Sequence, residues 1–196
     1  MKRNLITAVL MTIVTTILLG IIYPMVITGL SQVLFHDKAN GQLISQDGKV
    51  IGSRILAQPF TGAGYFHPRA SAAGTNGYDA TNSGGTNYGP TNQKLVDRVK
   101  QDVATAASEN PGKPVPVDYV TTSASGLDPD ITPANAEFQA PRVAKERGIS
   151  LEQVMAVVAE HTEARQFHFL GEARVNVLEL NLELDKKYPL VKRASR

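Results

Sequence analysis

The chain contains no cysteine, so it forms no disulfide. This absence fits an exported domain that does not rely on disulfides. It also lacks an excess of either charge, with 20 Lys and Arg against 18 Asp and Glu and a formal net charge of +2. Because the basic residues are interspersed with acidic ones, the composition gives no argument for a nucleic-acid-binding protein.

Histidine is scarce, and nothing around it forms a known catalytic motif. Nucleophilic catalysis by Ser or Thr needs an oriented base beside the hydroxyl, and no histidine lies in a triad pattern. His161 has three glutamates nearby in sequence, but no His-Glu-x-x-His spacing accompanies it. We therefore expect no catalytic residue and no metal site. The histidines are His36, His67, His161 and His168.

Asp128 and Asp130 are a possible catalytic pair of carboxylates, and they flank Pro129. Carboxylates in such turns commonly accept hydrogen bonds from backbone amides. The position therefore favours a structural turn over a catalytic pair.

One long run, Leu5 to Leu34, has no ionisable side chain except Tyr23. A helix needs roughly 20 apolar residues to span a bilayer, whereas the apolar cores of signal peptides run to about 15. The best candidate cleavage site, Gly29-Leu30-Ser31, is poor. The run therefore predicts a retained transmembrane anchor over residues 5–34 rather than a cleaved signal.

The charges beside this run predict its orientation. Lys2 and Arg3 precede it, whereas Asp37 and Lys38 cancel on the far side. Because cytoplasmic ends carry the excess of Lys and Arg, residues 1–4 should be cytoplasmic. Residues 35–196 should then form an extracytoplasmic domain, and the protein would be a single-pass protein of the bacterial inner membrane.

Small residues recur at every fourth position of the apolar run. This spacing places them along one gently wrapping stripe of a helix, where a second helix can approach closely. The stripe predicts a docking face at Thr12, Thr16, Gly20 and Pro24, although threonines that bond their own backbone would give the same pattern. Without an acidic or basic residue in the span, the helix is not an ion path by itself. The full stripe is Ala8, Thr12, Thr16, Gly20, Pro24 and Thr28.

The rest of the chain, about 160 residues, is long enough for one compact domain. Its patterns mix short strands and helices, which predicts an α+β (mixed α/β) fold. A hairpin is expected at 42–45 and 50–56, a strand at 115–122, and helices at 92–111, at 133–147, from 150 onward and at 175–188. In the last segment the leucines alternate as in a strand, but the Leu, Glu, Asn and Lys content favours a helix. Pro141 should kink the second helix or divide it in two, and Gly148 should end it. Ser150 and Gln153 form a capping box.

Residues 61–92 follow neither the helical nor the strand period and are rich in Gly, Ala, Ser, Thr and Asn. A compact domain seldom keeps so long a loop without a use, so the segment is either disordered or a binding surface. Interspersed aromatics argue against disorder. We expect contacts with a partner from Tyr65, Phe66, His67, Arg69, Tyr78 and Asn87.

The stretch from Ser83 to Asn92 leads into a helix, where a phosphate-binding loop would lie. A Walker loop ends in Gly-Lys-Ser/Thr, but Pro90 follows Gly89 here and supplies neither a charge nor an amide donor. A flexible glycine loop with an asparagine cap is the simpler interpretation. Ser83, Gly84, Gly85 and Gln139 remain as candidate nucleotide contacts.

Several longer motifs follow one another along the chain. They are Gly52-Ser53, Gln58-Pro59-Phe60, Tyr65-Phe66-His67-Pro68-Arg69, Tyr78-Asp79, the stretch 83–92, Ser125-Gly126-Leu127-Asp128-Pro129, Gln139 with Arg142-Val143-Ala144, His161-Thr162-Glu163, and the stretch 170–178. In this order, the motifs closely resemble those of the C subunit of the Kdp-type potassium-transporting ATPase. The resemblance spans nearly the whole chain, including the single N-terminal anchor.

The resemblance implies an accessory subunit of an ATP-driven potassium importer, with two partners. These are a channel-like A subunit that conducts the ion and a P-type B subunit that hydrolyses ATP. The C subunit would stabilise the complex and act as a catalytic chaperone for ATP use. Two hypotheses follow, namely a non-catalytic accessory subunit and a subunit that itself binds ATP. ATP and potassium would be substrates of the complex, and no bound cofactor is expected.

Overall fold

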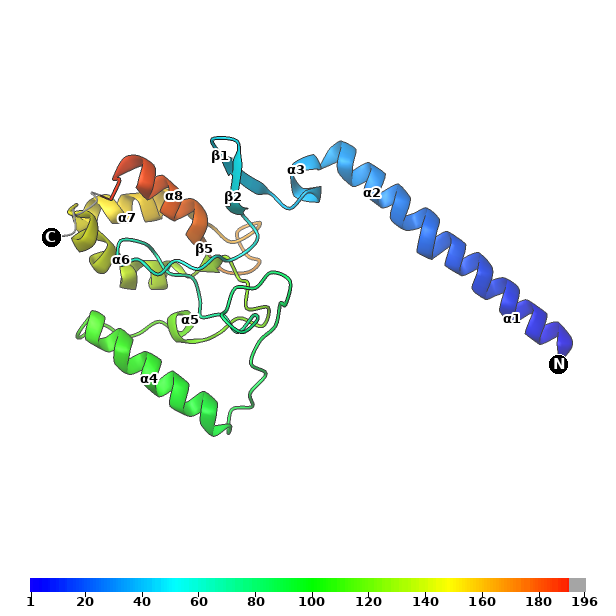
Figure 1. Ribbon diagram of the computed structural model, residues 1–196, viewed down its shortest axis with the longest axis horizontal. Coiled ribbons are helices and arrows are strands. Elements are labelled where there is room, and N and C mark those ends of the chain that lie inside the picture. The colour runs from blue at the N-terminus through cyan, green and yellow to red at the C-terminus, as the bar shows by residue number, and fades with distance from the viewer. Residues whose placement is uncertain (191–196) are drawn as a thin grey trace. The chain divides into compact units, whose positions relative to one another are not determined.

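The computed structural model describes residues 1–190, which form two compact units, one from Met1 to Ile51 and one from Gly52 onward. The first unit is dominated by a continuous helix, Lys2–Leu34, which is long and apolar enough to cross a membrane (Figure 1). Its segments are α1 (Lys2–Thr15), the π-helical η1 (Thr16–Ile22) and α2 (Tyr23–Leu34). None of its residues is buried within the chain.

The π-helical turn immediately precedes Pro24, which lies in the first turn of α2. A proline within a helix cannot donate to the carbonyl four residues back, and its ring clashes with that carbonyl. A wider turn before the proline relieves the clash, which is why such bulges occur at helix irregularities. The helix therefore accommodates Pro24 without ending.

After the short helix α3 (His36–Ala39), the strands β1 (Leu43–Gln46) and β2 (Lys49–Ser53) form the expected hairpin. Asp47 and Gly48, between the strands, both have positive φ angles of 51° and 75°. Two successive positive φ angles match the twist of a tight hairpin.

The second unit is a mixed α/β domain, as the sequence predicts. Its three-stranded antiparallel sheet has the order β3-β5-β4, with β3 at Asp130–Ile131, β4 at Thr162–Glu163 and β5 at Arg174–Asn176. In register, Ile131 lies opposite Val175, and Thr162 lies opposite Val175 on the other side. These strands were not predicted, because two or three residues are too few to show an alternating pattern.

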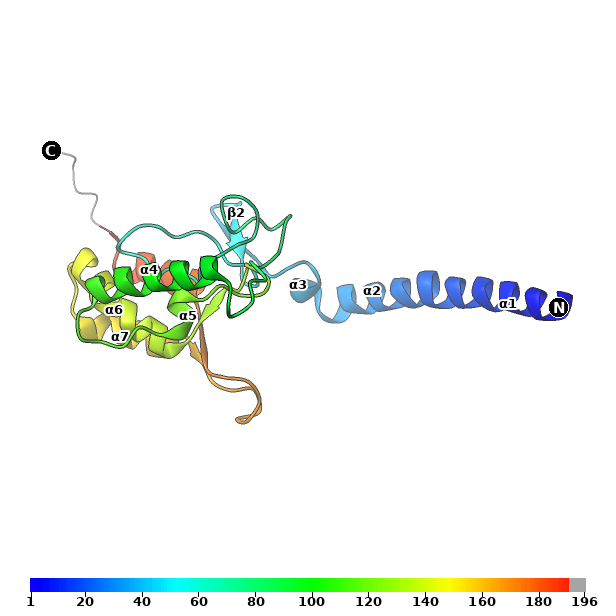
Figure 2. The same ribbon diagram turned by 90° about the horizontal axis from the view of Figure 1, so that it is seen from below.

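Three helices pack around this sheet and form the core (Figures 1 and 2). They are α6 (Pro133–Arg147), α7 (Leu151–Glu160) and α8 (Val177–Lys187). The core cluster consists of Phe66, Ile131, Ala136, Ala140, Val143, Ala144, Val154, Val157, Val158, Val175, Val177, Leu180 and Leu184. Phe66 comes from the segment 61–92, so that segment belongs to the core and does not lie loosely over it.

The predicted helix boundaries of this unit are largely confirmed. The Ser150 side chain accepts from the Gln153 amide and the Gln153 side chain accepts from the Ser150 amide, which completes the capping box. Gly148 ends α6 in the left-handed conformation. The segment 175–188 is helical from Val177, while its first two residues belong to β5.

Pro141 does not divide α6, which runs unbroken through it. Pro141 and Glu137, four residues earlier, are both exposed. The Glu137 carbonyl, which loses its helical donor, can therefore bond water, and the proline costs less here than it would inside the core.

The strand predicted at 115–122 is wrong, because a one-turn helix, α5 (Val117–Val120), lies there instead. Asp118 in this turn accepts hydrogen bonds from the Thr132 amide and hydroxyl and from Asn135 Nδ2, at 2.8, 3.1 and 3.0 Å. Tyr119 packs edge-on against Phe138, with 5.2 Å between the ring centroids. These tertiary contacts outweigh the β propensity of the valines.

Helix α4 (Gln93–Glu109) begins as predicted, with the Asn92 side chain accepting from the Lys94 amide at 2.9 Å. Its apolar face is covered only in part, since Ala106 is buried but Val103 is 38% exposed. In α7, Leu151 is exposed, whereas Val154, Val157 and Val158 lie in the core.

Candidate interaction surface

Segment 61–92 contains no helix or strand, yet it is held to the domain by specific hydrogen bonds. Phe66 is fully buried, and both of its backbone groups pair with the Asn181 side chain. The Phe66 amide donates to Asn181 Oδ1 at 2.8 Å, and Asn181 Nδ2 donates to the Phe66 carbonyl at 2.9 Å. A side-chain amide thus stands in for the neighbouring strand that this backbone lacks.

Gln139, on α6, pairs in the same way with the backbone of the next residue, His67. Its Oε1 accepts from the His67 amide at 2.8 Å, and its Nε2 donates to the His67 carbonyl at 3.0 Å and to Asn135 Oδ1 at 2.8 Å. Arg142 also donates to Gln139 Oε1, at 2.8 Å. Gln139 is only 2% exposed, so its amide is occupied in holding the segment.

His67 itself is half-buried, and its Nε2 lies 3.1 Å from the Gly62 carbonyl. Burial lowers the pKa of this imidazole, and the positive charge of Arg142 lowers it further. His67 is therefore a neutral, structural group at physiological pH.

The start of the segment is fastened by Arg147, whose side chain is fully buried. Its Nε donates to the Gly64 carbonyl at 2.7 Å, Nη1 to the Tyr188 carbonyl at 2.8 Å, and Nη2 to Asp185 at 2.9 Å. The guanidinium also lies over the Tyr65 ring, 5.0 Å from its centroid. Tyr65 donates to Asp185, and burial raises its pKa.

Farther along, Ser71 organises the turn around Tyr78. Its hydroxyl donates to the Gly126 carbonyl at 2.6 Å and accepts from the Tyr78 amide at 2.7 Å. The Tyr78 hydroxyl in turn donates to the Arg69 carbonyl at 3.0 Å, and burial raises the pKa of Tyr78. These bonds direct the aromatic side chain back onto the domain.

The glycine stretch lies along Ser125. The Gly84 amide and the Ser83 hydroxyl both donate to the Ser125 carbonyl, at 2.8 and 3.0 Å. A Cβ on Gly85 would lie 3.0 Å from the Ala124 carbonyl oxygen. The donors that a phosphate would require at Ser83 and Gly84 are therefore engaged within the chain. Gln139, the fourth candidate nucleotide contact, is bonded to His67 rather than to this stretch.

The six residues that were expected to contact a partner thus differ in how far they are buried. Phe66 is buried, and four others, Tyr65, His67, Arg69 and Tyr78, are half-buried with polar atoms bonded inside the domain. Asn87 is exposed, with a φ of 51°. The exposed residues of the segment are 61–63, 75–76, 79–83 and 87–91, and the last stretch includes Tyr88.

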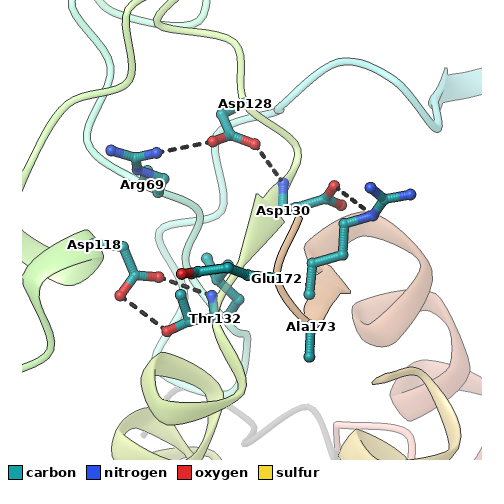
Figure 3. Close-up of a pocket in the computed structure, with 9 residues that line it drawn as sticks. Arg69, Asp118, Asp128, Asp130, Thr132, Glu172 and Ala173 are labelled. Atoms are coloured by element: carbon teal, nitrogen blue, oxygen red, sulfur yellow. Dashed lines mark hydrogen bonds and ion pairs between the residues drawn. The ribbon is translucent and has the colours of Figure 1, made fainter. Parts of the chain in front are cut away.

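A cleft of about 260 Å³ lies beside the anchored part of the segment (Figure 3). Three of its carboxylates, those of Asp118, Asp128 and Asp130, are already paired. Arg69 Nη1 lies 3.0 Å from Asp128 Oδ2, and Asp128 Oδ1 accepts from the Asp130 amide at 3.1 Å. The cleft is lined by Arg69, Asp118, Asp128, Asp130, Ile131, Thr132, Glu172, Ala173 and Arg174.

The Asp128 turn confirms the structural interpretation of the Asp-Pro-Asp sequence, because one carboxylate accepts from the backbone of the other residue. Asp130 also accepts from Asn176 Nδ2 at 3.2 Å and pairs with Arg174 at 3.2 Å. Burial raises the pKa of Asp130 in spite of this arginine, which lowers it in part. The pairings hold β3 to β5 and to segment 61–92.

The most important anchors were missed at the level of sequence. Asn181, Asn135 and Arg147 are buried polar residues on helices, and a pattern of apolar residues gives no sign of them. The signal that could have found Asn181 is its place on the apolar face of α8, between Leu180 and Leu184. A polar residue at such a position needs a bonded partner, which here is the Phe66 backbone.

In the N-terminal helix, the expected docking residues Thr12, Thr16, Gly20 and Pro24 are all exposed. The Thr12 hydroxyl donates to the Ala8 carbonyl at 2.9 Å, so this threonine bonds its own backbone. A Cβ on Gly20 would meet only the Thr16 methyl group, at 3.8 Å. The surface around Gly20 is therefore open to another helix.

Residues 1–190 contain one helix long and apolar enough to cross a membrane, followed by a mixed α/β domain, an arrangement consistent with the class of small membrane-anchored subunits. Residues 5–186 match the family model KdpC, described as K+-transporting ATPase, c chain. A curated relative from Koribacter versatilis, named potassium-transporting ATPase KdpC subunit, is 70% identical, and the alignment covers 97% of this chain and 98% of the relative.

Two further relatives carry the same name. The protein of Acidobacterium capsulatum is 56% identical over 95% of this chain and 100% of its own length. That of Rhodospirillum rubrum is 54% identical over 97% of this chain and 99% of its own. The chain belongs to the KdpC family of potassium-transporting ATPase subunits, which confirms the resemblance found in its motifs.

Proposed function

We propose that the chain is a non-catalytic accessory subunit, which stabilises the potassium-transporting complex and promotes ATP use by its catalytic subunit. The observation that carries the proposal is the helix Lys2–Leu34, 33 residues long and with none of its residues buried within the chain. Its partners are the channel-like A subunit and the P-type B subunit that the family resemblance implies.

The helix suits docking for a physical reason. Lipid tails are as apolar as leucine, so helices associate in a bilayer through close packing at small residues. The open surface at Gly20 and the hydroxyl of Thr16 lie one helical turn apart and offer such a face. The π-helical turn that contains both residues adds an irregular surface, which a matching partner helix would fill.

The soluble domain belongs outside the cytoplasm in this proposal, because Lys2 and Arg3 mark the cytoplasmic end. The domain then cannot touch cytoplasmic ATP. Its effect on ATP use passes through helix contacts, as a coupling between two states of the complex. Protease treatment of sealed cells and of inverted vesicles tests the orientation. Cleavage of the domain only in inverted vesicles would contradict the proposal.

The docking face is tested by replacing Thr16 and Gly20 with leucine and measuring the yield of co-purified subunits. The matched control replaces Thr15 and Gly29, a threonine and a glycine that lie off the stripe. The proposal expects a loss of yield for the first pair alone. Equal yields from both pairs would exclude a specific helix face.

The competing hypothesis is that the chain itself binds ATP through Ser83, Gly84, Gly85 and Gln139. The bonds of Ser83 and Gly84 to Ser125, and of Gln139 to His67, count against it. Equilibrium binding of ATP to the purified full-length chain decides between them. Saturable binding in the millimolar range, lost in Ser83→Ala, would replace the accessory role with a nucleotide-binding one.

A partner contact is also expected from the exposed end of segment 61–92. Tyr88 is 40% exposed and bonds no side chain among residues 1–190. Tyr88→Ser, together with Asn87→Gly, should impair potassium uptake while leaving the domain's unfolding temperature unchanged. Normal uptake at low potassium would contradict this contact.

A further inference from the structure

A two-stranded ribbon leaves the body of the domain between β4 and β5, seen in orange in Figure 2. Its outer end is closed by Gln166 and Leu170, which exchange two backbone hydrogen bonds of 3.0 and 2.9 Å. Its base is held by Arg174, which pairs with Glu163 at 2.7 Å and with Asp130 at 3.2 Å. The ribbon is therefore a defined structure and carries its tip in a fixed form.

The tip of this ribbon is apolar and exposed. Phe167 is 71% exposed, Phe169 70% and Leu170 48%. Other large apolar side chains of the domain, such as Val117 and Leu151, are also exposed, but they lie far apart in the sequence. Scattered single apolar residues on a surface need no explanation, but three large ones within four positions of a projecting turn form a patch. We call Phe167, Phe169 and Leu170 the ribbon tip.

The backbone of the turn is strained as well. Phe167 has a φ of 52° and His168 a φ of 68°, so two bulky residues in succession are left-handed. Hairpin turns of this form normally carry Asn-Gly, because a large side chain is disfavoured in that region. Backbone strain of this kind persists where the surrounding structure or a function requires it, and both phenylalanines remain largely exposed.

The charges of the ribbon indicate what covers the tip. Residues 163–174 contain two acidic and two basic side chains, so a negatively charged bilayer surface would not attract the ribbon as a whole. Arg165, directly before the turn, is exposed and forms no ion pair with any residue in the described part of the chain. A rigid aromatic turn with one free guanidinium suits a shaped protein socket better than a fluid lipid surface.

We propose that the ribbon tip inserts into an apolar socket on another subunit of the ATPase, with an acidic side chain at its rim that pairs with Arg165. The inference rests on the proposed role in assembly and names a second contact for it, separate from the membrane helix. Exposed phenylalanines on a preformed turn lose little entropy on docking, so a small contact of this kind can dominate an interface.

The first test distinguishes the folding of the ribbon tip from its contact with another subunit. Phe167→Asn with His168→Gly supplies the residues that the turn prefers and removes one aromatic, so the unfolding temperature of the full-length chain should stay equal or rise. Retention of the chain in the purified ATPase should fall by about tenfold or more, as for loss of a hot-spot residue. Unchanged retention would overturn the proposal.

A second variant tests whether a loss of retention comes from a changed turn conformation and not from the lost aromatic contact. Phe169→Ser leaves both left-handed residues in place and should weaken retention in the same direction. Glu146→Ser, at an exposed position on α6, is the matched control and should have no effect. A loss of retention in the control equal to that in Phe169→Ser would also overturn the proposal, because it would show a general effect of surface change.

Crosslinking identifies the occupant. The chain has no cysteine, so His168→Cys carries a single benzophenone label, with Glu146→Cys as the control position. In membranes that contain the whole ATPase, we expect an adduct between position 168 and a peptide of another subunit that includes apolar residues and an Asp or Glu. Adducts with lipid alone would assign the tip to the bilayer and overturn the proposal.

The two proposals fail in distinguishable ways. If Thr16→Leu with Gly20→Leu disrupts the complex while the tip variants do not, the assembly role stands and the tip contact is wrong. If neither set changes retention, the assembly role itself fails.

Discussion

Asn181 and Phe66 are joined by two hydrogen bonds of 2.8 and 2.9 Å between the side-chain amide of the first and the backbone of the second. The residues lie 115 positions apart, and both are buried. This pair ties segment 61–92 to α8 and makes a segment without regular structure part of the core.

Removing this amide should destabilise the domain strongly. Asn181→Ala leaves a buried N–H and a buried carbonyl of Phe66 without partners, and each costs about 1–3 kcal/mol. We expect a loss of about 3 kcal/mol in the free energy of unfolding, measured by denaturant titration of the full-length chain in detergent. The control Asn82→Ala, at an exposed position, should change it by less than about 0.5 kcal/mol.

Arg147 should not tolerate exchange for lysine. Its guanidinium reaches the Gly64 and Tyr188 carbonyls and Asp185 at once, and a single ammonium cannot span this fork. Arg147→Lys should cost about 2–3 kcal/mol by the same titration, since buried acceptors lose their donors. Lys145→Arg, on the exposed side of the same helix, serves as the matched control. A stability equal to wild type in Arg147→Lys would show that the bonds are not needed.

Two glycines test how closely the segment lies on the domain. Gly126 has a φ of 67°, and a Cβ there would lie 2.6 Å from the Gly84 carbonyl and 2.8 Å from the Ala73 amide nitrogen. Gly84 has no such neighbours within 4 Å. Gly126→Ala should therefore lower the unfolding temperature and open residues 73–84 to protease, whereas Gly84→Ala should do neither. Equal cleavage of the two variants would contradict the close packing.

Alkaline pH should weaken the domain through Tyr119. Burial, and then the charge of Glu109, raises its pKa from 10.0 to about 12. Below pH 10 the folded and unfolded states both hold the proton. Between about pH 10 and 12 only the unfolded state releases it, so stability falls as the pH rises through this window.

For one proton, the slope is at most about 1.4 kcal/mol per pH unit. Tyr119→Phe should remove its share of this slope, in denaturant titrations at pH 9 and pH 11. A part should remain, because burial also raises the pKa of Tyr65 and Tyr78. An unchanged slope in the variant would show that Tyr119 ionises alike in both states.

The sequence was most informative where the signal is local. The apolar run, the cap at Asn92, the box at Ser150 and Gln153, and the stop at Gly148 each depend on neighbouring residues, and the structure has them all. The strand expected at 115–122 failed because Asp118 and Tyr119 are engaged by α6, which no local pattern records.

The candidate interaction surface shows the same difference between local sequence signals and tertiary contacts. The sequence singled out segment 61–92 as unusual and named its aromatic residues, but it treated them as contacts for a partner. Their direction depends on Asn181, Gln139 and Arg147, which are distant in the chain. The exposed ribbon tip escaped notice altogether, because the exposure of Phe167 and Phe169 is a property of the folded surface.

The sequence alone determined the candidate membrane helix, the main helix boundaries and the KdpC family, because apolar length, caps and motif order are written in consecutive residues. The tertiary structure alone decided which polar groups form hydrogen bonds inside the domain and which apolar side chains are exposed on its surface. That choice follows from the pairing of buried amides and carbonyls across distant parts of the chain, since a buried polar group must find a partner wherever the fold brings one.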